Sequence, residues 1–349
     1  MIYMDNAPEV VITLYATLKA GGIFTIINSG VQLQKLSYIM GDCAPTVVVA
    51  DSKKEERIIR ALQDNSLECS IIWVGEKKNE TSGNNHFPTY QWEHLLSKED
   101  ADHPNHQAGT TPFPGTLDID LAGLIYTSGS TGDPKGVMES HHNIISAARS
   151  IIRYLENTPD EIILNTLPLS FDYGLYQVIM SLMFGGTVVL ERSFIFLSRL
   201  LNLIAKEKIT GLPIVPTIVA ILMKTIDIKS FDLSTLRYIT NTGAAFPVDH
   251  IKKLRRTIPH VKIYSMFGLT ECKRIAFLSP GEIDHKPESV GKAMPNCEVF
   301  IVDENEKPVI NDQTGELVVR GSNVMQGYWN APDQTAATFR SGLGFNEKL

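Results

Sequence analysis

The 349-residue sequence has few cysteines and no long apolar segment. Its cysteines, Cys43, Cys69, Cys272 and Cys297, are widely spaced and form no C-x-x-C pair, which excludes the usual zinc-site and disulfide patterns. No apolar run approaches the roughly 20 residues that a membrane span requires, and the start of the chain lacks the basic and apolar regions of a signal peptide. These absences favour a cytoplasmic protein without a membrane span.

The sequence also lacks an excess of basic residues. Its 32 Lys and Arg are outnumbered by 39 Asp and Glu, so the formal net charge is -7. An acidic chain of this kind is not expected to bind nucleic acid or an anionic membrane surface as its main partner. Its length allows a sizeable core and favours two or more packed units.

Glycines, hydroxyl residues and one lysine gather in residues 126–136. An apolar run typical of a buried strand precedes this stretch, and helical spacing follows it from Ser140 onward. Glycines let several backbone N–H groups converge on one anion, the hydroxyls add donors, and the lysine adds a mobile positive charge. The stretch therefore predicts a phosphate-binding loop, and the alternative is a flexible turn. The predicted phosphate ligands are Thr127, Ser128, Gly129, Ser130, Thr131, Gly132 and Lys135.

The spacing of this stretch excludes two common phosphate loops. A P-loop requires lysine and a hydroxyl residue directly after its second glycine, whereas Asp133 and Pro134 follow Gly132, and the glycine spacing also fails G-x-G-x-x-G. A P-loop phosphotransferase is therefore nearly excluded. The stretch does match S-G-[ST]-T-G-x-P-K-G, so the chain resembles the superfamily of AMP-forming acyl-CoA synthetases, adenylation domains and luciferases.

Strand and helix patterns alternate along most of the chain, before and after the phosphate loop. This alternation is typical of parallel sheets covered by helices on both faces. After residue 283 the pattern changes to short alternating segments separated by polar turns, which indicates antiparallel hairpins. We expect an α/β fold with two doubly wound, mostly parallel sheets flanked by helices, plus a small antiparallel β-barrel subdomain. The expected parts are 1–116 and 117–282 for the two α/β regions and 283–340 for the barrel.

A second motif, in residues 264–271, follows a predicted parallel strand and resembles the superfamily signature Y-G-x-T-E. The resemblance implies that Phe267 lies against adenine, that Gly268 belongs to the same nucleotide-binding turn, that Thr270 contacts the α-phosphate and that Glu271 helps to hold Mg²⁺. A hard cation on phosphates favours a carboxylate oxygen. The resemblance therefore implies three catalytic residues, Lys135, Thr270 and Glu271.

Two further segments resemble superfamily blocks. Gly243, Ala244 and Ala245 follow another predicted strand and resemble the adenine-binding turn, where small residues let the backbone approach the base; the alternative is a plain turn before a helix. A block from Gly315 to Phe339 resembles a third signature that adds no catalytic residue.

The acid substrate is indicated by Phe171 and Asp172. The resemblance implies that Phe171 guards the acyl and pantetheine path, and Asp172 coincides with the aspartate that peptide-synthetase adenylation domains use for a substrate ammonium. A buried carboxylate opposite an acyl chain is costly unless it is paired, which favours an amino-bearing acid. The alternative is that Asp172 caps the helix that starts near Leu175, and the sequence leaves both open.

The resemblance implies ATP- and Mg²⁺-dependent activation of a small-molecule carboxylic acid as an acyl-adenylate, followed by transfer to the thiol of coenzyme A or of a carrier-protein phosphopantetheine. Superfamily members carry further residues before the first helix here and continue after residue 339 with a mobile C-terminal domain that holds a catalytic lysine. We therefore expect a partial N-terminal large domain, and the alternative function is a catalytically silent nucleotide-binding fragment. The sequence leaves open whether the acid is fatty, aryl or amino.

Overall fold

The computed structural model describes residues 1–76, 87–96, 115–127, 132–192, 197–225, 228–309 and 313–340. The chain divides into two compact units, Met1–His141 with Tyr328–Asn330, and His142–Gly327 with Ala331–Leu349. This division groups the segment that carries Lys135 with the first unit, whereas the sequence patterns suggested a boundary at residue 116. Among the described helices, none is both long and apolar enough to cross a bilayer. All four cysteines are free thiols.

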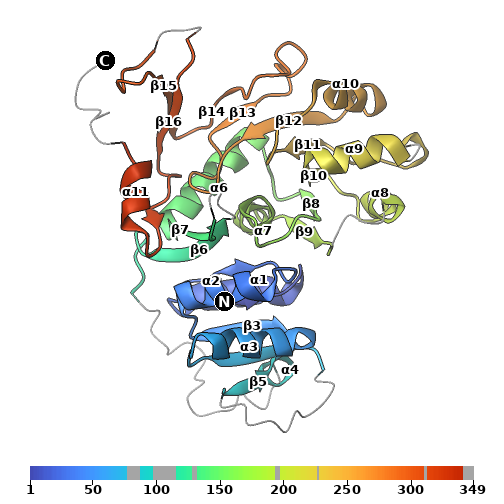
Figure 1. Cartoon of the computed structure of the whole chain (residues 1–349). Coiled ribbons are helices and arrows are strands. Elements are labelled where there is room, and N and C mark those ends of the chain that lie inside the picture. Colours follow the sequence, from blue (N-terminus) through green and yellow to red (C-terminus); the bar gives the residue numbers. More distant parts are fainter. Residues whose placement is uncertain are drawn as a thin grey trace. The chain divides into compact units, whose positions relative to one another are not determined.

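A five-stranded parallel sheet organises the first unit, in the order β2-β1-β3-β4-β5. This confirms one of the two predicted mostly parallel sheets. Figure 1 labels its strands β3 and β5. Strand β2 has only two residues, and Phe24 just before it pairs with Gly123 of a different sheet. The elements are β1 (Ile2–Tyr3), α1 (Pro8–Lys19), β2 (Ile26–Ile27), α2 (Leu33–Cys43), β3 (Val47–Asp51), η1 (Ser52–Lys54), α3 (Glu55–Asp64), β4 (Ser70–Val74), β5 (Thr89–Gln91) and α4 (Trp92–Leu95).

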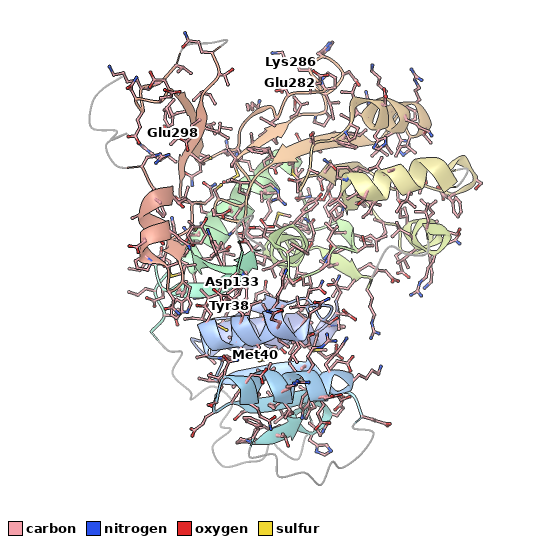
Figure 2. The ribbon with its side chains drawn as sticks, in the orientation of Figure 1. Tyr38, Met40, Asp133, Glu282, Lys286 and Glu298 are labelled. Carbon is pink, nitrogen blue, oxygen red and sulfur yellow. The ribbon has the colours of Figure 1, made fainter. Side chains whose placement is uncertain are left out.

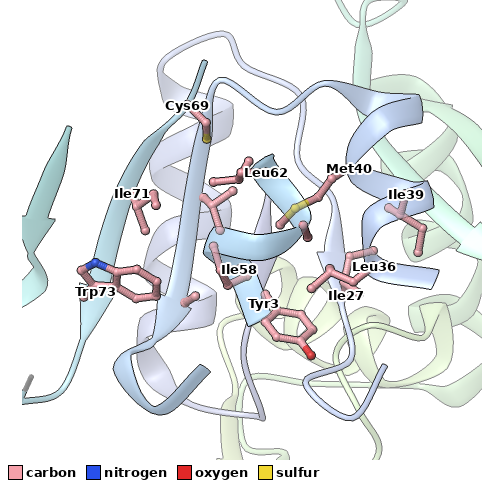
Figure 3. Close-up of a cluster of buried hydrophobic side chains, with 13 residues drawn as sticks. Tyr3, Ile27, Leu36, Ile39, Met40, Ile58, Leu62, Cys69, Ile71 and Trp73 are labelled. Carbon is pink, nitrogen blue, oxygen red and sulfur yellow. The ribbon is translucent and has the colours of Figure 1, made fainter. Parts of the chain in front are cut away.

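One cluster of 13 buried side chains packs on this sheet (Figure 3). Leu36 and Met40 on α2, and Ile58 and Leu62 on α3, are each spaced four residues apart, so each pair lies on one helix face. These faces pack with the strands around Trp73, which is fully buried. Burying one such side chain contributes about 1.5–3 kcal/mol, and the cluster therefore fixes α2 firmly on the sheet.

The predicted phosphate loop joins two antiparallel strands of a second sheet in the first unit. These strands are β6 (Leu121–Thr127) and β7 (Lys135–Ser140), and β17 (Gly327–Tyr328) pairs with β7 as a third strand. The sequence patterns predicted a strand, the loop and then a helix from Ser140. The structure adds a strand that was not predicted, because residues 135–140 pair with β6 before helix α6 (His141–Leu155) begins.

A seven-stranded sheet organises the second unit, in the order β14-β13-β12-β11-β10-β8-β9 (Figure 1). Its five strands from β12 to β9 are parallel, which confirms the second mostly parallel sheet, and β13 and β14 are antiparallel. The strands are β8 (Ile162–Asn165), β9 (Thr187–Leu190), β10 (Gly211–Ile214), β11 (Tyr238–Asn241), β12 (Lys262–Phe267), β13 (Ala276–Leu278) and β14 (Lys292–Ala293). The remaining helices are α7 (Asp172–Phe184), α8 (Leu197–Lys206), α9 (Pro216–Thr225), η2 (Ile228–Ser230) and α10 (Val248–Thr257).

The strand order reverses between β8 and β10. From β8 the chain passes through α7 to β9 on one side, and then through α8 to β10 on the other side of β8. Open α/β sheets bind ligands outside the carboxyl ends of their strands at such a switch point. The topology therefore marks one edge of this sheet as the expected ligand edge.

The region predicted as a β-barrel is an open hairpin. Strands β15 (Cys297–Val302) and β16 (Glu316–Gly321) pair antiparallel as a two-stranded sheet, and helix α11 (Pro332–Thr338) follows later in the chain. The hairpin is confirmed, but within the described ranges no barrel closes. The reason is that the next strand along the chain, β17, pairs with β7 and does not extend this hairpin.

Candidate functional site

The hairpin of the first unit carries Lys135 at the start of β7. Thr127, the last residue of β6, pairs with Lys135, so the segment between them is the hairpin connection. Of the predicted ligands, Ser128, Gly129, Ser130 and Thr131 lie outside the described residues. Gly132 is exposed and has φ 141°, a conformation that favours glycine.

The side chain of Lys135 lies over an aromatic ring. Its Nζ is 5.2 Å from the centroid of the Tyr328 ring, and the Trp329 N–H donates to the Gly136 carbonyl at 2.7 Å. A cation–π contact of this kind is attractive and leaves the ammonium donors available to an anion. The block around Tyr328, which sequence analysis treated as adding nothing to catalysis, therefore supplies a contact that positions the predicted phosphate ligand.

Asp42 on α2 holds the base of the hairpin. The Tyr126 hydroxyl donates to Asp42 Oδ2 at 2.5 Å. The Asp42 carbonyl accepts from Trp329 Nε1 and from Asn330 Nδ2, each at 3.0 Å. Burial raises the pKa of Tyr126, so its hydroxyl remains a proton donor. These bonds join residues that are far apart in the sequence, and no local pattern could have indicated them.

Asp133, the residue after Gly132, also lies near α2. Figure 2 labels Tyr38, which is on α2, and Asp133. Burial, followed by the negative charges of Asp42 and Asp133, raises the pKa of the Tyr38 phenol. Asp133 is therefore close enough to α2 for its negative charge to affect the Tyr38 phenol.

In the second unit, two predicted ligand segments leave adjacent parallel strands at the same edge. Asn241 at the end of β11 pairs with Ser265 of β12, so the segments that follow the two strands start side by side. After β11, the predicted residues Gly243, Ala244 and Ala245 are exposed, and Gly243 has φ 86°. After β12, the turn that begins at Phe267 carries Thr270 and Glu271. The structure brings these predicted residues to the carboxyl edge, as expected for an open α/β sheet.

The turn over residues 268–274 folds back tightly on itself. A Cβ atom at Gly268 would lie 2.0 Å from the Lys273 carbonyl oxygen, which leaves no room for any side chain there. The Ile275 N–H donates to the Phe267 carbonyl at 2.8 Å and closes the turn. Glycine is therefore required at this position by close backbone approach.

Buried polar side chains hold the backbone of this turn. Asn323, which is 1% exposed, donates through Nδ2 to the Cys272 carbonyl at 2.7 Å and to the Arg274 carbonyl at 3.1 Å. The Lys273 ammonium donates to the Thr270 carbonyl at 2.7 Å, and burial lowers its pKa well below the usual value. The Met325 N–H donates to the Glu271 carbonyl at 2.7 Å. Sequence analysis identified neither Asn323 nor Lys273, although both fix the backbone that carries Thr270 and Glu271.

Phe171 and Asp172 follow β8, which borders the switch point. Phe171 is the N-cap residue of α7 and is 60% exposed, whereas Asp172 is the first helical residue. Asp172 Oδ1 accepts from the Tyr173 N–H at 2.8 Å, and α7 has no side-chain cap bond. The helix begins at Asp172 and not near Leu175, so Asp172 is not its N-cap residue, although its carboxylate accepts from an N–H of the first helical turn.

Arg274 faces Asp172 and was not identified from the sequence. Its Nη1 lies 3.7 Å from Asp172 Oδ2, and both side chains are largely buried. Burial raises the pKa of Asp172, and the positive charge of Arg274 opposes that rise. The only sequence signal was the pair Lys273-Arg274, which follows the second motif after Cys272 and precedes an apolar stretch.

Glu271 is suited to the predicted metal. Among the described residues, no three His, Cys, Asp or Glu side chains gather as a protein-only metal site. Mg²⁺ on nucleotides does not need one, since it usually binds through one or two carboxylates together with phosphates and water. A half-buried carboxylate on a rigid turn therefore fits this role.

Known proteins resemble this chain over most of its length. The model of a family described as "AMP-binding enzyme" matches residues 1–329. An indoleacetate–CoA ligase from Aromatoleum aromaticum is 32% identical over 97% of this chain, which spans 63% of that relative's length.

Two solved structures share the fold. VinN in complex with L-aspartate is 30% identical to this chain and has a TM-score of 0.79. The match covers 97% of this chain and 79% of the VinN chain. ATP-bound MatB from Rhodopseudomonas palustris is 25% identical, has a TM-score of 0.80, and is matched over 97% of this chain and 63% of its own.

Proposed function

Since the chain belongs to the AMP-binding enzyme family, we propose that it binds ATP and activates a carboxylic acid as an acyl-adenylate. The observation that carries the proposal is the rigid turn after β12, which presents Thr270 and Glu271 at the carboxyl edge of the sheet. The ATP-bound MatB structure, a relative with the same fold, supports the nucleotide.

In the proposed reaction, the acid's carboxylate attacks the α-phosphorus of ATP in line and pyrophosphate leaves. The protein's task in such a phosphate displacement is to position the groups and to offset developing negative charge. Thr270 donates its hydroxyl to the α-phosphate, and the Lys135 ammonium donates to the phosphate oxygens. The Lys135 side chain suits this role because its aromatic contact leaves its donors available.

Mg²⁺ would be held by the Glu271 carboxylate, and when bound it neutralises phosphate charge. The backbone of Glu271 is fixed by Met325, which limits the positions that the carboxylate can reach. Phe267 and the small residues Gly243, Ala244 and Ala245 provide the adenine site, where exposed backbone allows close approach of a flat base.

The acyl group would then be transferred from the adenylate to a thiol, which loses its proton, and AMP would leave. We assign this thiol to coenzyme A or to the phosphopantetheine of a carrier protein, with the exposed Phe171 ring on the thiol path. The indoleacetate–CoA ligase supports coenzyme A. The four free cysteines fit a reducing compartment such as the cytoplasm. Because the chain spans 63% of that relative's length, thiol transfer is a proposal for the whole protein.

ATP–pyrophosphate exchange tests adenylation directly. With Mg²⁺ and a panel of acids, labelled pyrophosphate should enter ATP only when the correct acid is present. A thermal-shift titration with ATP provides the binding arm, since a ligand at about 100 times its Kd adds roughly 2.7 kcal/mol of stability. ATP binding without exchange for any acid would favour the silent nucleotide-binding alternative, and absence of both would refute the proposal.

A further inference from the structure

A surface cavity lies between helix α6 and the segment that leads into β15. Its volume is about 310 Å³, near the lower end of the range for small-molecule sites. Helix α6 contributes six of its lining residues, and Pro295 and Asn296 form the opposite wall. All of these residues belong to the second unit, and none of them is a predicted nucleotide ligand. The cavity is therefore separate from the site described above.

Two arginines line this cavity one helical turn apart. Arg149 and Arg153 are spaced four residues along α6, so their side chains leave the same face of the helix. Both are exposed, and among the described residues neither has a hydrogen-bond or ion-pair partner. None of the lining residues is Asp or Glu. On a chain of formal net charge -7, the cavity is thus a positive site without a carboxylate of its own.

The acidic residues next to the cavity in the sequence are paired elsewhere. Glu156, three residues after Arg153, pairs with Lys262 at 2.9 Å. Glu298, near the start of β15, pairs with Arg320 at 3.1 Å. These carboxylates therefore do not neutralise the two arginines, and a bound anion is the group that would complete them.

Hydrogen bonds fix the wall opposite the helix. The Asn296 Nδ2 group donates to the Ser146 hydroxyl oxygen at 2.9 Å, which joins the wall to α6. Asn296 has φ 62°, a left-handed conformation that asparagine adopts more readily than most residues. Two residues earlier, the Met294 N–H donates to the Ile275 carbonyl at 2.9 Å. The cavity is therefore formed before any ligand binds.

The lining combines hydrogen-bond donors with carbon surface. Each guanidinium presents a fork of N–H donors that matches phosphate oxygens. The Ser146 oxygen accepts from Asn296, so the hydroxyl hydrogen remains a further donor. Ile145, which is 37% exposed, and Pro295 provide apolar surface beside these donors. A phosphate dianion attached to a small organic group satisfies both parts of this lining, whereas a carboxylate carries charge for only one arginine.

We propose that this cavity binds the phosphomonoester group of a small organic molecule, at a second site distinct from the nucleotide site. Arg149 and Arg153 donate to the phosphate oxygens, and Ile145 and Pro295 contact the organic part. This inference goes beyond the proposed function, because it uses none of the residues assigned to adenylation.

Phenyl phosphate is the test ligand, since it joins a phosphate dianion to a small apolar ring. It is titrated by calorimetry into the protein saturated with Mg²⁺ and a non-hydrolysable ATP analogue, so that the nucleotide site is already occupied. One equivalent should bind. Inorganic phosphate lacks the ring and phenyl sulfate carries only one charge, so each should bind at least about fivefold more weakly.

Three variants assign the binding to the cavity. Arg149→Gln and Arg153→Gln should each weaken phenyl phosphate binding about fivefold, because an exposed charge pair contributes only modestly. Ile145→Asp places a carboxylate one turn before Arg149 and should lower binding below detection. The matched control is Arg256→Gln, which removes an exposed arginine on α10 outside the cavity and should leave the affinity unchanged. All four positions are exposed, and circular dichroism checks that each variant folds.

Two outcomes would overturn the proposal. Equal binding of the three anions, or an equal loss in Arg256→Gln and the cavity variants, would show only unspecific attraction of anions to exposed arginines. No measurable binding up to about 10 mM phenyl phosphate, well above a millimolar Kd, would show that the cavity is not a binding site. Neither outcome bears on the proposed function, which fails only if ATP binding and pyrophosphate exchange are both absent.

Discussion

The hairpin that carries Lys135 and the turn that carries Glu271 are held in different ways. The hairpin is fixed at its base by side chains that reach across the first unit, including Tyr126 and Trp329 to Asp42. The turn in the second unit is fixed along its own backbone by buried polar groups, with Asn323 contributing two bonds.

This difference indicates different tolerances in the two regions. The contacts at the base of the hairpin are made by side chains, which can shift when a neighbouring residue changes. A turn locked at successive carbonyls cannot adjust without losing buried hydrogen bonds, which suits a carboxylate that holds a metal ion at a defined place. The predictions below test this contrast.

The largest effect is expected for Glu271→Gln. Loss of a carboxylate from a rigid position should lower ATP–pyrophosphate exchange by about 10²–10³-fold, as removal of one preorganised electrostatic group typically does. The control is Glu288→Gln, at an exposed position. Exchange within threefold of wild type at saturating Mg²⁺ would contradict the metal role.

A smaller effect is expected for Lys135→Met, which keeps much of the contact with the Tyr328 ring but removes the ammonium. Loss of one charge-assisted hydrogen bond should weaken ATP binding by about 10–100-fold. Affinities for ATP and AMP are measured by calorimetry, and Lys252→Met at an exposed site on α10 is the control. An equal loss for ATP and AMP would argue against contact with the outer phosphates.

The backbone contrast is tested by Gly268→Ala against Gly136→Ala. At Gly268 the new methyl group meets the Lys273 carbonyl at 2.0 Å, whereas at Gly136 it meets side-chain atoms of Tyr126 and Trp329 at 3.2 and 3.3 Å. Gly268→Ala should lower the free energy of unfolding by about 1–3 kcal/mol, and Gly136→Ala should cost less because side chains can shift.

Denaturant unfolding followed by circular dichroism measures both glycine changes. A larger loss for Gly136→Ala than for Gly268→Ala would show that the hairpin, and not the turn, is the less tolerant region.

The smallest effect is expected for Tyr126→Phe, which removes the hydrogen bond to Asp42. One such bond contributes about 1 kcal/mol, and Asp42 retains its carbonyl contacts with Trp329 and Asn330. ATP affinity should change by less than about fivefold, because the rest of the base remains. A loss in affinity as large as that of Lys135→Met would show that this single bond sets the position of the lysine.

Several features followed from the sequence because they depend on local chemistry. The repeated strand and helix periodicities predicted both mostly parallel sheets, since buried parallel strands and their covering helices have distinct spacings. The motifs around Lys135 and Glu271 identified the family, because each places several residue types at fixed spacing. The sequence also placed Gly243 and Glu271 after strands, and the structure puts both segments at one sheet edge.

Other features were decided only by tertiary structure. The strand β7 was missed because its stability comes from pairing with β6, and the barrel was wrong because β17 pairs with β7 rather than with β16. The ion-pair partner of Asp172, Arg274, lies on another turn about a hundred residues further along the chain, so no local pattern could have indicated it. Local spacing fixes which segments form helices, strands and turns, but only packing determines which distant charges are buried together.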